Sequence, residues 1–167
     1  MFHNRFLRRA AALVLTAAMA VTAALTGLAA YPMPIQTARE TEAVYLFNAD
    51  TGKTILEQNA GQQQYVASLT KLMTALLLLE SGKDLNGTVT VPTDLTQEFR
   101  DIQNANGTTM GLRIGETVRR IDLLNAMLIV SANDAASVVA WDVAGSVAGF
   151  VQQMNARAAE LGCTGTN

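Results

Sequence analysis

The segment "VASLTKLMTALLLLE", residues 66–80, restricts the fold more than any other part of the chain. Apart from Ser68 and Lys71 near its start and two threonines, every residue before the final glutamate is apolar, and these residues occupy all sides of a helical wheel. A helix that is apolar all round is buried on all sides. We therefore expect this helix at the centre of a globular domain.

The first thirty residues have the order of a secretory signal. "MFHNRFLRR" carries three arginines and no acidic residue, and an apolar run from Ala10 to Ala30 follows it. The small residues that end this run predict a signal peptide over residues 1–29 and cleavage after Ala29. The run is also close to the roughly 20 residues that cross a bilayer, so an uncleaved membrane anchor remains open. Either segment would export the chain.

Charge and histidine content exclude several classes of function. Without the three leader arginines the chain has nine Lys and Arg residues against fourteen Asp and Glu, a net charge of about −5, which argues against nucleic acid as a partner. His3, in the leader, is the only histidine, so the exported chain cannot build a Ser-His-Asp triad or a histidine zinc site. Cys163 is the only cysteine, which excludes an internal disulfide.

The part after the leader is predicted to begin with a β-hairpin. "AVYLFNAD" and "TILEQNA" are rich in β-forming residues and flank "TGK", where Gly52 can take a positive φ. Residues 82–116 are polar and rich in Gly, Asn and Thr, which predicts loops and short strands. A two-stranded sheet is marginal on its own, and "CTGTN" at the end contains no terminating element. We therefore expect an N-terminal fragment, cut before further strands.

Three helices are predicted after residue 120, each from a capping residue and an apolar run. Asp122 precedes "LLNAMLIV", and Asn133 or Asp134 precedes "AASVVAWDVAG". Ser146 precedes "VAGFVQQMNARAAEL", which Gly162 ends. The predicted order is thus a hairpin followed by several helices.

Ser68 and Lys71 form the pattern S-x-x-K. Residues three apart lie on one face of a helix, so the lysine amine can reach the serine hydroxyl. Burial among apolar side chains lowers the pKa of a lysine, which a general base requires. A serine in the first turn also lies near free backbone N–H groups, which suit an oxyanion. The structural alternative is a serine that caps the helix and a lysine that snorkels to solvent.

Ser131 and Asn133, in "SAND", lie at the break between two predicted helices. They present a hydroxyl and an amide on a short turn, although two capping side chains would give the same pattern. The two patterns occur in this order about sixty residues apart. S-x-x-K with S-D-N and K-T-G is the signature of class A β-lactamases and penicillin-binding proteins.

The chain resembles the low-molecular-mass penicillin-binding proteins, the serine D-alanyl-D-alanine carboxypeptidases. The resemblance covers nearly everything after the leader, and "MGLRIGE" and "FVQQMNARAAELG" resemble these carboxypeptidases more than class A β-lactamases. It implies that Ser68 is the nucleophile and Lys71 its base. It also implies that Ser131 is a proton shuttle and that Asn133 holds the lysine and the substrate amide.

Two departures from the family pattern stand out. Ala132 replaces a glycine that is frequent in the second motif, and we expect no consequence because alanine is small. The K-T-G motif is missing, since "TGKT" at residues 51–54 is the hairpin turn and no Lys-Thr-Gly follows Asn133. In the family this motif lies on a later strand that binds the substrate carboxylate and completes the oxyanion hole. We expect it beyond Asn167.

The resemblance implies an α/β (α+β) fold of the penicillin-recognising serine transpeptidase and β-lactamase-like type. Residues 30–167 would be its helix-rich part with an N-terminal β-hairpin, truncated before the K-T-G strand. The implied partners are peptidoglycan stem peptides ending in D-Ala-D-Ala and β-lactam antibiotics, with no nucleic acid, no metal and no other cofactor. Membrane association through the leader or a later C-terminal segment remains open.

The implied activity is that of an exported, periplasmic or extracytoplasmic enzyme. It would remove the terminal D-alanine of stem pentapeptides through an acyl-enzyme on Ser68, whereas the 167-residue chain, lacking the third motif, is expected to turn over poorly or not at all. Three alternatives remain: a D,D-endopeptidase, a β-lactamase, and a non-catalytic cell-wall-binding protein with the same fold.

Overall fold

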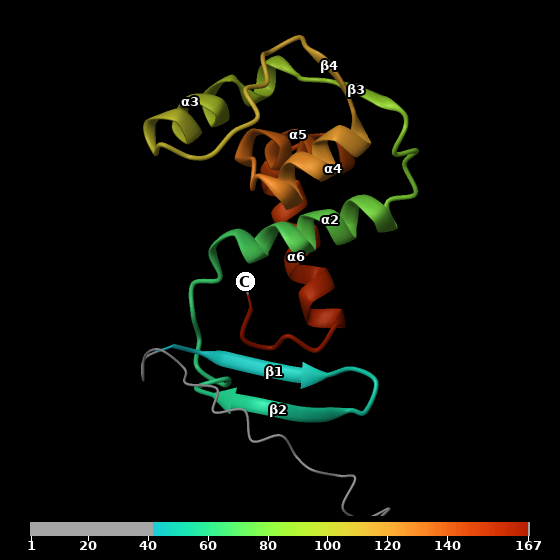
Figure 1. Ribbon diagram of the computed structural model, residues 1–167. Helices are drawn as coiled ribbons and strands as arrows, with labels where there is room; N and C mark the ends of the chain where they lie inside the picture. The colour runs from blue at the N-terminus through green and yellow to red at the C-terminus, as the bar shows by residue number, and fades with distance from the viewer. Residues whose placement is uncertain (1–41, 167) are drawn as a thin grey trace, which may run out of the picture. The chain divides into compact units, whose positions relative to one another are not determined.

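A computed structural model describes residues 42–166 of the chain (Figure 1). The predicted signal peptide over residues 1–29, and the membrane anchor that is its alternative, lie outside the described residues. The chain divides into two compact units, Met1–Ala60 and Gly61–Asn167. Each unit is described by itself below.

The first unit contains the predicted β-hairpin. Strand β1 (Val44–Asn48) pairs antiparallel with β2 (Lys53–Gln58). Gly52 lies in the connecting turn with a φ of 68°, a left-handed conformation that glycine adopts without steric cost. The side chain of Asn48 closes the same turn by accepting a hydrogen bond of 2.8 Å from the backbone N–H of Thr51. The prediction of the hairpin and of Gly52 in its turn is therefore confirmed.

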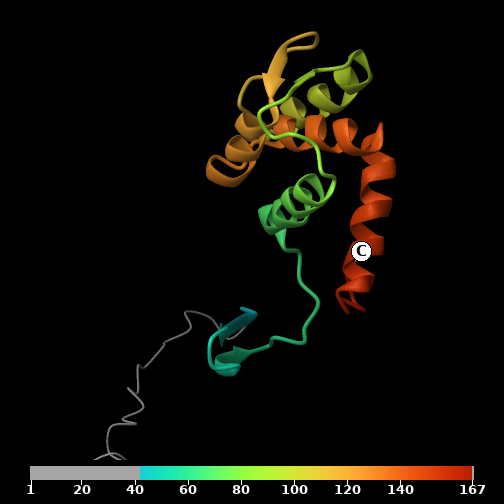
Figure 2. The same ribbon diagram turned by 90° about the vertical axis from the view of Figure 1, so that its right-hand side faces the viewer.

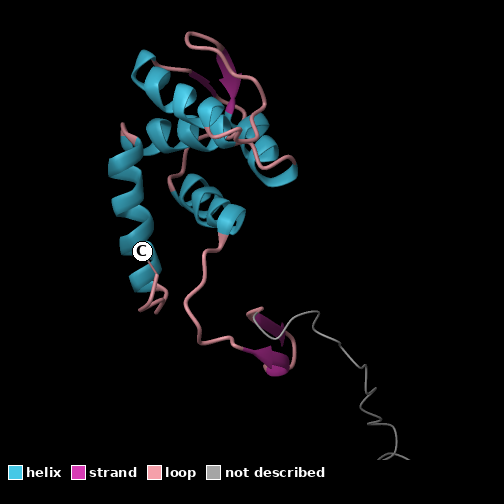
Figure 3. Cartoon of the chain, turned by 90° about the vertical axis from the view of Figure 1, so that its left-hand side faces the viewer, coloured by secondary structure: helices cyan, strands magenta, loops and turns pink. Residues whose placement is uncertain are grey.

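The second unit is mostly helical, as Figures 2 and 3 show. Its elements in order are the 3₁₀ turn η1 (Ala67–Leu69), α2 (Thr70–Glu80), β3 (Thr88–Thr90), the 3₁₀ turn η2 (Thr93–Leu95), α3 (Thr96–Asn104), β4 (Thr117–Arg119), α4 (Arg120–Ile129), α5 (Asn133–Ala144) and α6 (Val147–Glu160). Strands β3 and β4 form a short antiparallel pair. Among residues 42–166, no single helix is long and apolar enough to cross a membrane, and α5 with α6 meets that length and composition only as a pair bent by 82°.

Helix α5 lies at the centre of the second unit, where it contacts α2, α3, α4 and α6 (Figures 1 and 2). Val138 and Val139 of α5 are buried together with Leu78 of α2 and Leu123 of α4. Phe150 of α6 belongs to a second, smaller apolar cluster. This packing fixes the start of α2 relative to the start of α5. The predicted site residues lie in or directly before these two helices.

Helix α2 is not buried all round, so this part of the prediction is wrong. Leu78 is fully buried, but Leu72 and Leu79 are 59% and 55% exposed. The helix buries one face against its neighbouring helices and leaves the other face open within the second unit. Lys71 is on the buried face, with only 8% of its surface exposed.

Two of the predicted helix caps are also wrong. Helix α4 begins before Asp122, which lies in its first turn and binds Arg119 at 2.8 Å instead of capping the helix. Helix α5 has Ala132 at its N-cap position, so neither Asn133 nor Asp134 is the cap. Both residues lie in the first turn of α5 and bind a neighbouring loop, as described below.

The last predicted cap is confirmed, and one helix was not predicted. The Oγ atom of Ser146 accepts a hydrogen bond of 3.0 Å from the backbone N–H of Gly149, and α6 ends before Gly162, whose φ is 83°. Helix α3 falls within residues 82–116, where the sequence predicts loops and short strands. Its sequence, "TQEFRDIQN", is mostly polar, so its composition gives little indication of a helix.

Candidate active site

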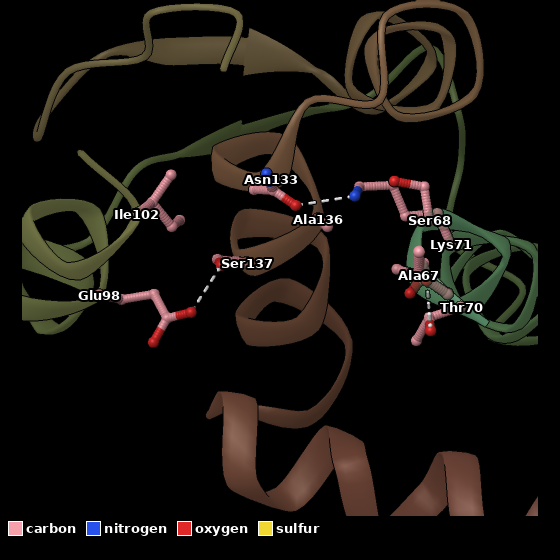
Figure 4. A pocket seen from close by; sticks show the side chains of 10 residues that line it. Ala67, Ser68, Thr70, Lys71, Glu98, Ile102, Asn133, Ala136 and Ser137 are labelled. Atoms are coloured by element: carbon pink, nitrogen blue, oxygen red, sulfur yellow. Dashed lines mark hydrogen bonds between the residues drawn. The ribbon is translucent and has the colours of Figure 1, made fainter. Parts of the chain in front are cut away.

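The predicted site residues gather at one pocket of the second unit (Figure 4). The pocket has a volume of about 460 Å³ and lies between the start of α2, helix α3 and the first turns of α5. Ser68, Lys71 and Asn133 line it directly. Ser131, in the turn before α5, joins the group through a hydrogen bond to Ser68.

The two serine hydroxyls contact each other. The Oγ atom of Ser131 donates a hydrogen bond of 2.6 Å to the Oγ atom of Ser68. Two residues here have left-handed backbone: Ser131 itself, with a φ of 61°, and Ala67, directly before Ser68, with a φ of 47°. This conformation costs a residue other than glycine about 1–2 kcal/mol, and such strain concentrates at functional sites.

Lys71 is held by Asn133. Its Nζ atom donates a hydrogen bond of 2.7 Å to Oδ1 of Asn133. Burial lowers the pKa of Lys71, because water is the environment that best stabilises the charged amine. Among the described residues, no carboxylate forms an ion pair with Lys71 that would raise the pKa again. The amine therefore loses its proton more readily than an exposed lysine, in agreement with the expectation from the apolar helix.

Ser68 and Lys71 line the same pocket, but no hydrogen bond joins their side chains in the part of the chain that the structure describes. The S-x-x-K spacing brings the two groups to one side of the pocket without a direct bond. Since Ser131 donates to Ser68, the hydrogen of the Ser68 hydroxyl is not used in that bond and can be given to a base.

The orientation of Asn133 is set by a backbone carbonyl. Its main-chain N–H and its side-chain Nδ2 both donate to the carbonyl oxygen of Thr108, at 2.8 Å and 3.1 Å. An amide nitrogen can only donate and an amide oxygen can only accept. With Nδ2 bound to Thr108, Oδ1 is the atom that faces Lys71.

Asp134 supports this arrangement, and the sequence analysis missed its role. Its carboxylate is 2% exposed and accepts hydrogen bonds of 3.0 Å from the backbone N–H groups of Met110, Gly111 and Leu112. A fourth bond, of 2.9 Å, comes from Ala135. These bonds compensate the cost of burying the charge and hold the loop against the start of α5. The available signal was an acidic residue directly after S-x-N, which we interpreted as a helix cap.

The other end of the pocket is also polar, and sequence reasoning missed it because α3 was not predicted. Glu98 and Ile102 of α3 line it together with Ala136 and Ser137 of α5. The hydroxyl of Ser137, which is 7% exposed, donates a hydrogen bond of 3.2 Å to Oε1 of Glu98. Within residues 42–166, no group of three or more His, Cys, Asp or Glu side chains is arranged to hold a metal ion.

Comparison with known proteins identifies relatives of the chain. The profile of the Peptidase S11 family, described as D-alanyl-D-alanine carboxypeptidase, matches residues 31–167. The chain is 32% identical over 130 residues to the D-alanyl-D-alanine carboxypeptidase DacF of Bacillus subtilis, which covers 78% of this chain and 33% of that protein. It is also 32% identical over 134 residues to a D-alanyl-D-alanine endopeptidase of Pseudomonas aeruginosa, with coverage of 80% and 41%.

Solved structures agree with this relationship. The crystal structure of the Streptomyces K15 DD-transpeptidase matches with a TM-score of 0.63 and 29% identity, over 72% of this chain and 48% of that one. Penicillin binding protein 5 from Haemophilus influenzae matches with a TM-score of 0.59 and 30% identity, over 70% and 34%. The chain thus spans between a third and a half of the length of these relatives, and the predicted penicillin-recognising fold class is confirmed. Because the family profile covers residues 31–167, the chain belongs to the D-alanyl-D-alanine carboxypeptidase family.

Proposed function

We propose that the whole protein is a serine D-alanyl-D-alanine carboxypeptidase that removes the terminal D-alanine from peptidoglycan stem pentapeptides. The observation that carries this proposal is the hydrogen bond between the hydroxyls of Ser131 and Ser68 in the pocket that also holds buried Lys71. The relatives named as carboxypeptidases support the same reaction. β-Lactams would acylate the same serine.

The proposed reaction has two steps on Ser68. The Oγ atom of Ser68 attacks the carbonyl carbon of the D-Ala-D-Ala bond while neutral Lys71 takes its proton. The C–N bond then breaks, and the proton that Lys71 took passes through Ser131, whose hydroxyl touches the nucleophile, to the nitrogen of the departing D-alanine, so that Lys71 is neutral again. Water hydrolyses the resulting ester and restores the Ser68 hydroxyl. Asn133 holds Lys71 and is proposed to bind the substrate amide.

We further propose that residues 30–167 are part of a larger catalytic domain and that residues 1–29 direct its export. The relatives support this, since the chain covers only 33% of the length of the B. subtilis carboxypeptidase. No Lys-Thr-Gly follows Asn133 in the printed sequence, and the proposed domain takes this motif from a strand beyond Asn167. The enzyme would then act outside the cytoplasm, where its cell-wall substrate lies.

A D,D-endopeptidase is the second candidate. The P. aeruginosa endopeptidase is as similar to this chain as the B. subtilis carboxypeptidase is, with 32% identity to each. Both reactions use the same acyl-enzyme chemistry and differ in the amine that leaves. Product analysis on a pentapeptide and on a cross-linked muropeptide distinguishes the two activities.

Covalent labelling of the full-length protein with a fluorescent penicillin tests the proposal. We expect one label per molecule in the wild type and none after Ser68→Ala. Ser81→Ala is the matched control, because Ser81 follows the same helix but bonds the carbonyl of Leu78 and lies outside the pocket. Labelling that persists in Ser68→Ala would rule out Ser68 as the nucleophile.

A further inference from the structure

We propose that Glu98 and Ser137 form a subsite that binds a cationic group of the substrate and thereby sets the specificity of the enzyme. The inference rests on the proposed function, because it assigns a second part of the same pocket. Glu98 is the only carboxylate among the residues that line this pocket, and Lys71 is the only cation. The two charges belong to different helices, α3 and α2.

Glu98 retains capacity for a ligand. The Ser137 hydroxyl, a neutral donor, binds Oε1 at 3.2 Å. No Lys or Arg of the described residues forms an ion pair with Glu98. A carboxylate can accept about four hydrogen bonds, so one neutral donor leaves most of its acceptor sites and all of its charge uncompensated. A half-buried carboxylate in this state favours an ammonium or another N–H donor.

The position of Glu98 favours binding over proton transfer. Asn133 and Ser137 are four residues apart on one face of α5, about 6 Å along the helix axis. Asn133 binds Lys71 and Ser137 binds Glu98, so the carboxylate lies one turn away from the lysine contact. Figure 4 shows Glu98 and Ser68 at opposite sides of the pocket, to the left and to the right of α5. No hydrogen bond among the described residues joins Glu98 to Ser68 or Lys71.

The lining between the two ends suits an aliphatic chain that carries an amine. Ala136 is small and leaves the floor of the pocket open, and Ile102 provides an apolar wall beside Glu98. A peptide with its reacting carbonyl at Ser68 could therefore extend a side chain along α5 and place a terminal ammonium at Glu98. The inferred substrate class is an acyl-D-Ala-D-Ala peptide with a free side-chain amine on the residue before the first D-alanine.

A pair of peptides tests this subsite by binding alone. The probes are Lys-D-Ala-D-Ala and the same peptide with its side-chain amine acetylated, each with a blocked N-terminus. Calorimetry on the full-length Ser68→Ala protein, which cannot form an acyl-enzyme, should give about ten-fold tighter binding of the free amine. Adding Glu98→Gln should abolish this preference and Glu98→Asp should keep part of it. The matched control Asp101→Asn, an exposed acid on the same helix, should keep all of it.

Each outcome decides the inference. Equal affinities for the two peptides, or a preference that survives Glu98→Gln, would overturn it. A fall in kcat with both peptides when Glu98→Gln is made in the protein with Ser68 intact would assign proton transfer to Glu98 and would also overturn it. The proposed function fails separately, if penicillin does not label the wild type or still labels Ser68→Ala. That test is independent of the subsite, because the penicillin label carries no amine that the subsite must recognise.

Discussion

The hydroxyl of Ser131 lies 2.6 Å from that of Ser68, which is 63 residues earlier in the chain. A second bond, from Lys71 to Asn133, runs beside it and joins the same two parts of the fold. Each bond connects the start of α2 with the start of α5. The geometry of the site therefore depends on how these two helices pack, and on the apolar residues between them.

Removing the Ser131 hydroxyl should lower the rate of acylation by penicillin by about 10²–10⁴-fold, the range typical of proton-transfer groups. The acylation rate should fall by the same factor in Ser131→Ala and in Ser131→Gly. They should differ in stability, because glycine relieves the left-handed backbone at φ 61° and alanine does not. We expect Ser131→Gly to have a free energy of unfolding about 1 kcal/mol above that of Ser131→Ala. Equal stabilities would show that the backbone there is not strained.

The acylation rate should rise with pH as Lys71 loses its proton. Since burial lowers the pKa of Lys71, this rise should be centred below the ordinary pKa of lysine. Lys71→Arg should abolish acylation at every pH, because a guanidinium does not deprotonate in this range. A rate profile measured from neutral to alkaline pH, with the fold checked by circular dichroism, tests both statements. A profile that stays flat would exclude Lys71 as the base.

The same pKa has a consequence for stability. Between the lowered pKa in the folded state and the ordinary pKa of lysine, the unfolded chain binds the proton more tightly. The free energy of unfolding should therefore rise with pH over this interval. Lys71→Met should remove this dependence, which denaturant titrations at several pH values can measure.

Asp134→Ala should destabilise the protein by about 3 kcal/mol or more, because it leaves four backbone N–H groups without their acceptor. Acylation should also fall, since the loop that orients Asn133 is released. Asp122→Ala is the matched control: its carboxylate binds Arg119 at the surface, and the loss should be about 0–1 kcal/mol. Urea denaturation measures both values, and similar losses would contradict the supporting role of Asp134.

Two leucines of α2 test whether the helix has one buried face. Leu78→Ala should cost about 2–5 kcal/mol, because Leu78 is fully buried in the core. Leu72→Ala, the same substitution on the same helix, should change the stability of this chain by about 0.5 kcal/mol or less, because Leu72 is 59% exposed. Equal losses would show that both faces of the helix are packed.

Local patterns in the sequence predicted the hairpin, four of the helices (α2, α4, α5 and α6) and the candidate site residues. The S-x-x-K and S-x-N patterns can be recognised in the sequence because each spans only a few residues within or beside one helix. The contact of Ser131 with Ser68 could not be predicted from the sequence, since it depends on how α2 packs against α5. The sequence also could not tell which leucines of α2 find partners, because apolar residues lie on both of its faces.

Helix α3 was missed for a different reason. Its residues are mainly polar and follow a stretch of turn-forming residues, and this composition outweighed the helical spacing of its few apolar residues, Phe99 and Ile102. Glu98 was missed with it, because an acidic residue on a predicted loop gives no reason to expect a place in a pocket. Tertiary contacts with α5, including the bond from Ser137 to Glu98, accompany the helix in the folded unit.

The four hydrogen bonds to Asp134 also bear on hydrogen exchange. Met110, Gly111 and Leu112 belong to a segment without regular secondary structure, and the amides of such a segment ordinarily exchange with solvent within seconds or minutes. Here the buried carboxylate of Asp134 accepts hydrogen bonds from these amides. Their hydrogens should therefore exchange with solvent only when the start of α5 opens. In kinetic terms the segment belongs to the same cooperative unit as the central helix.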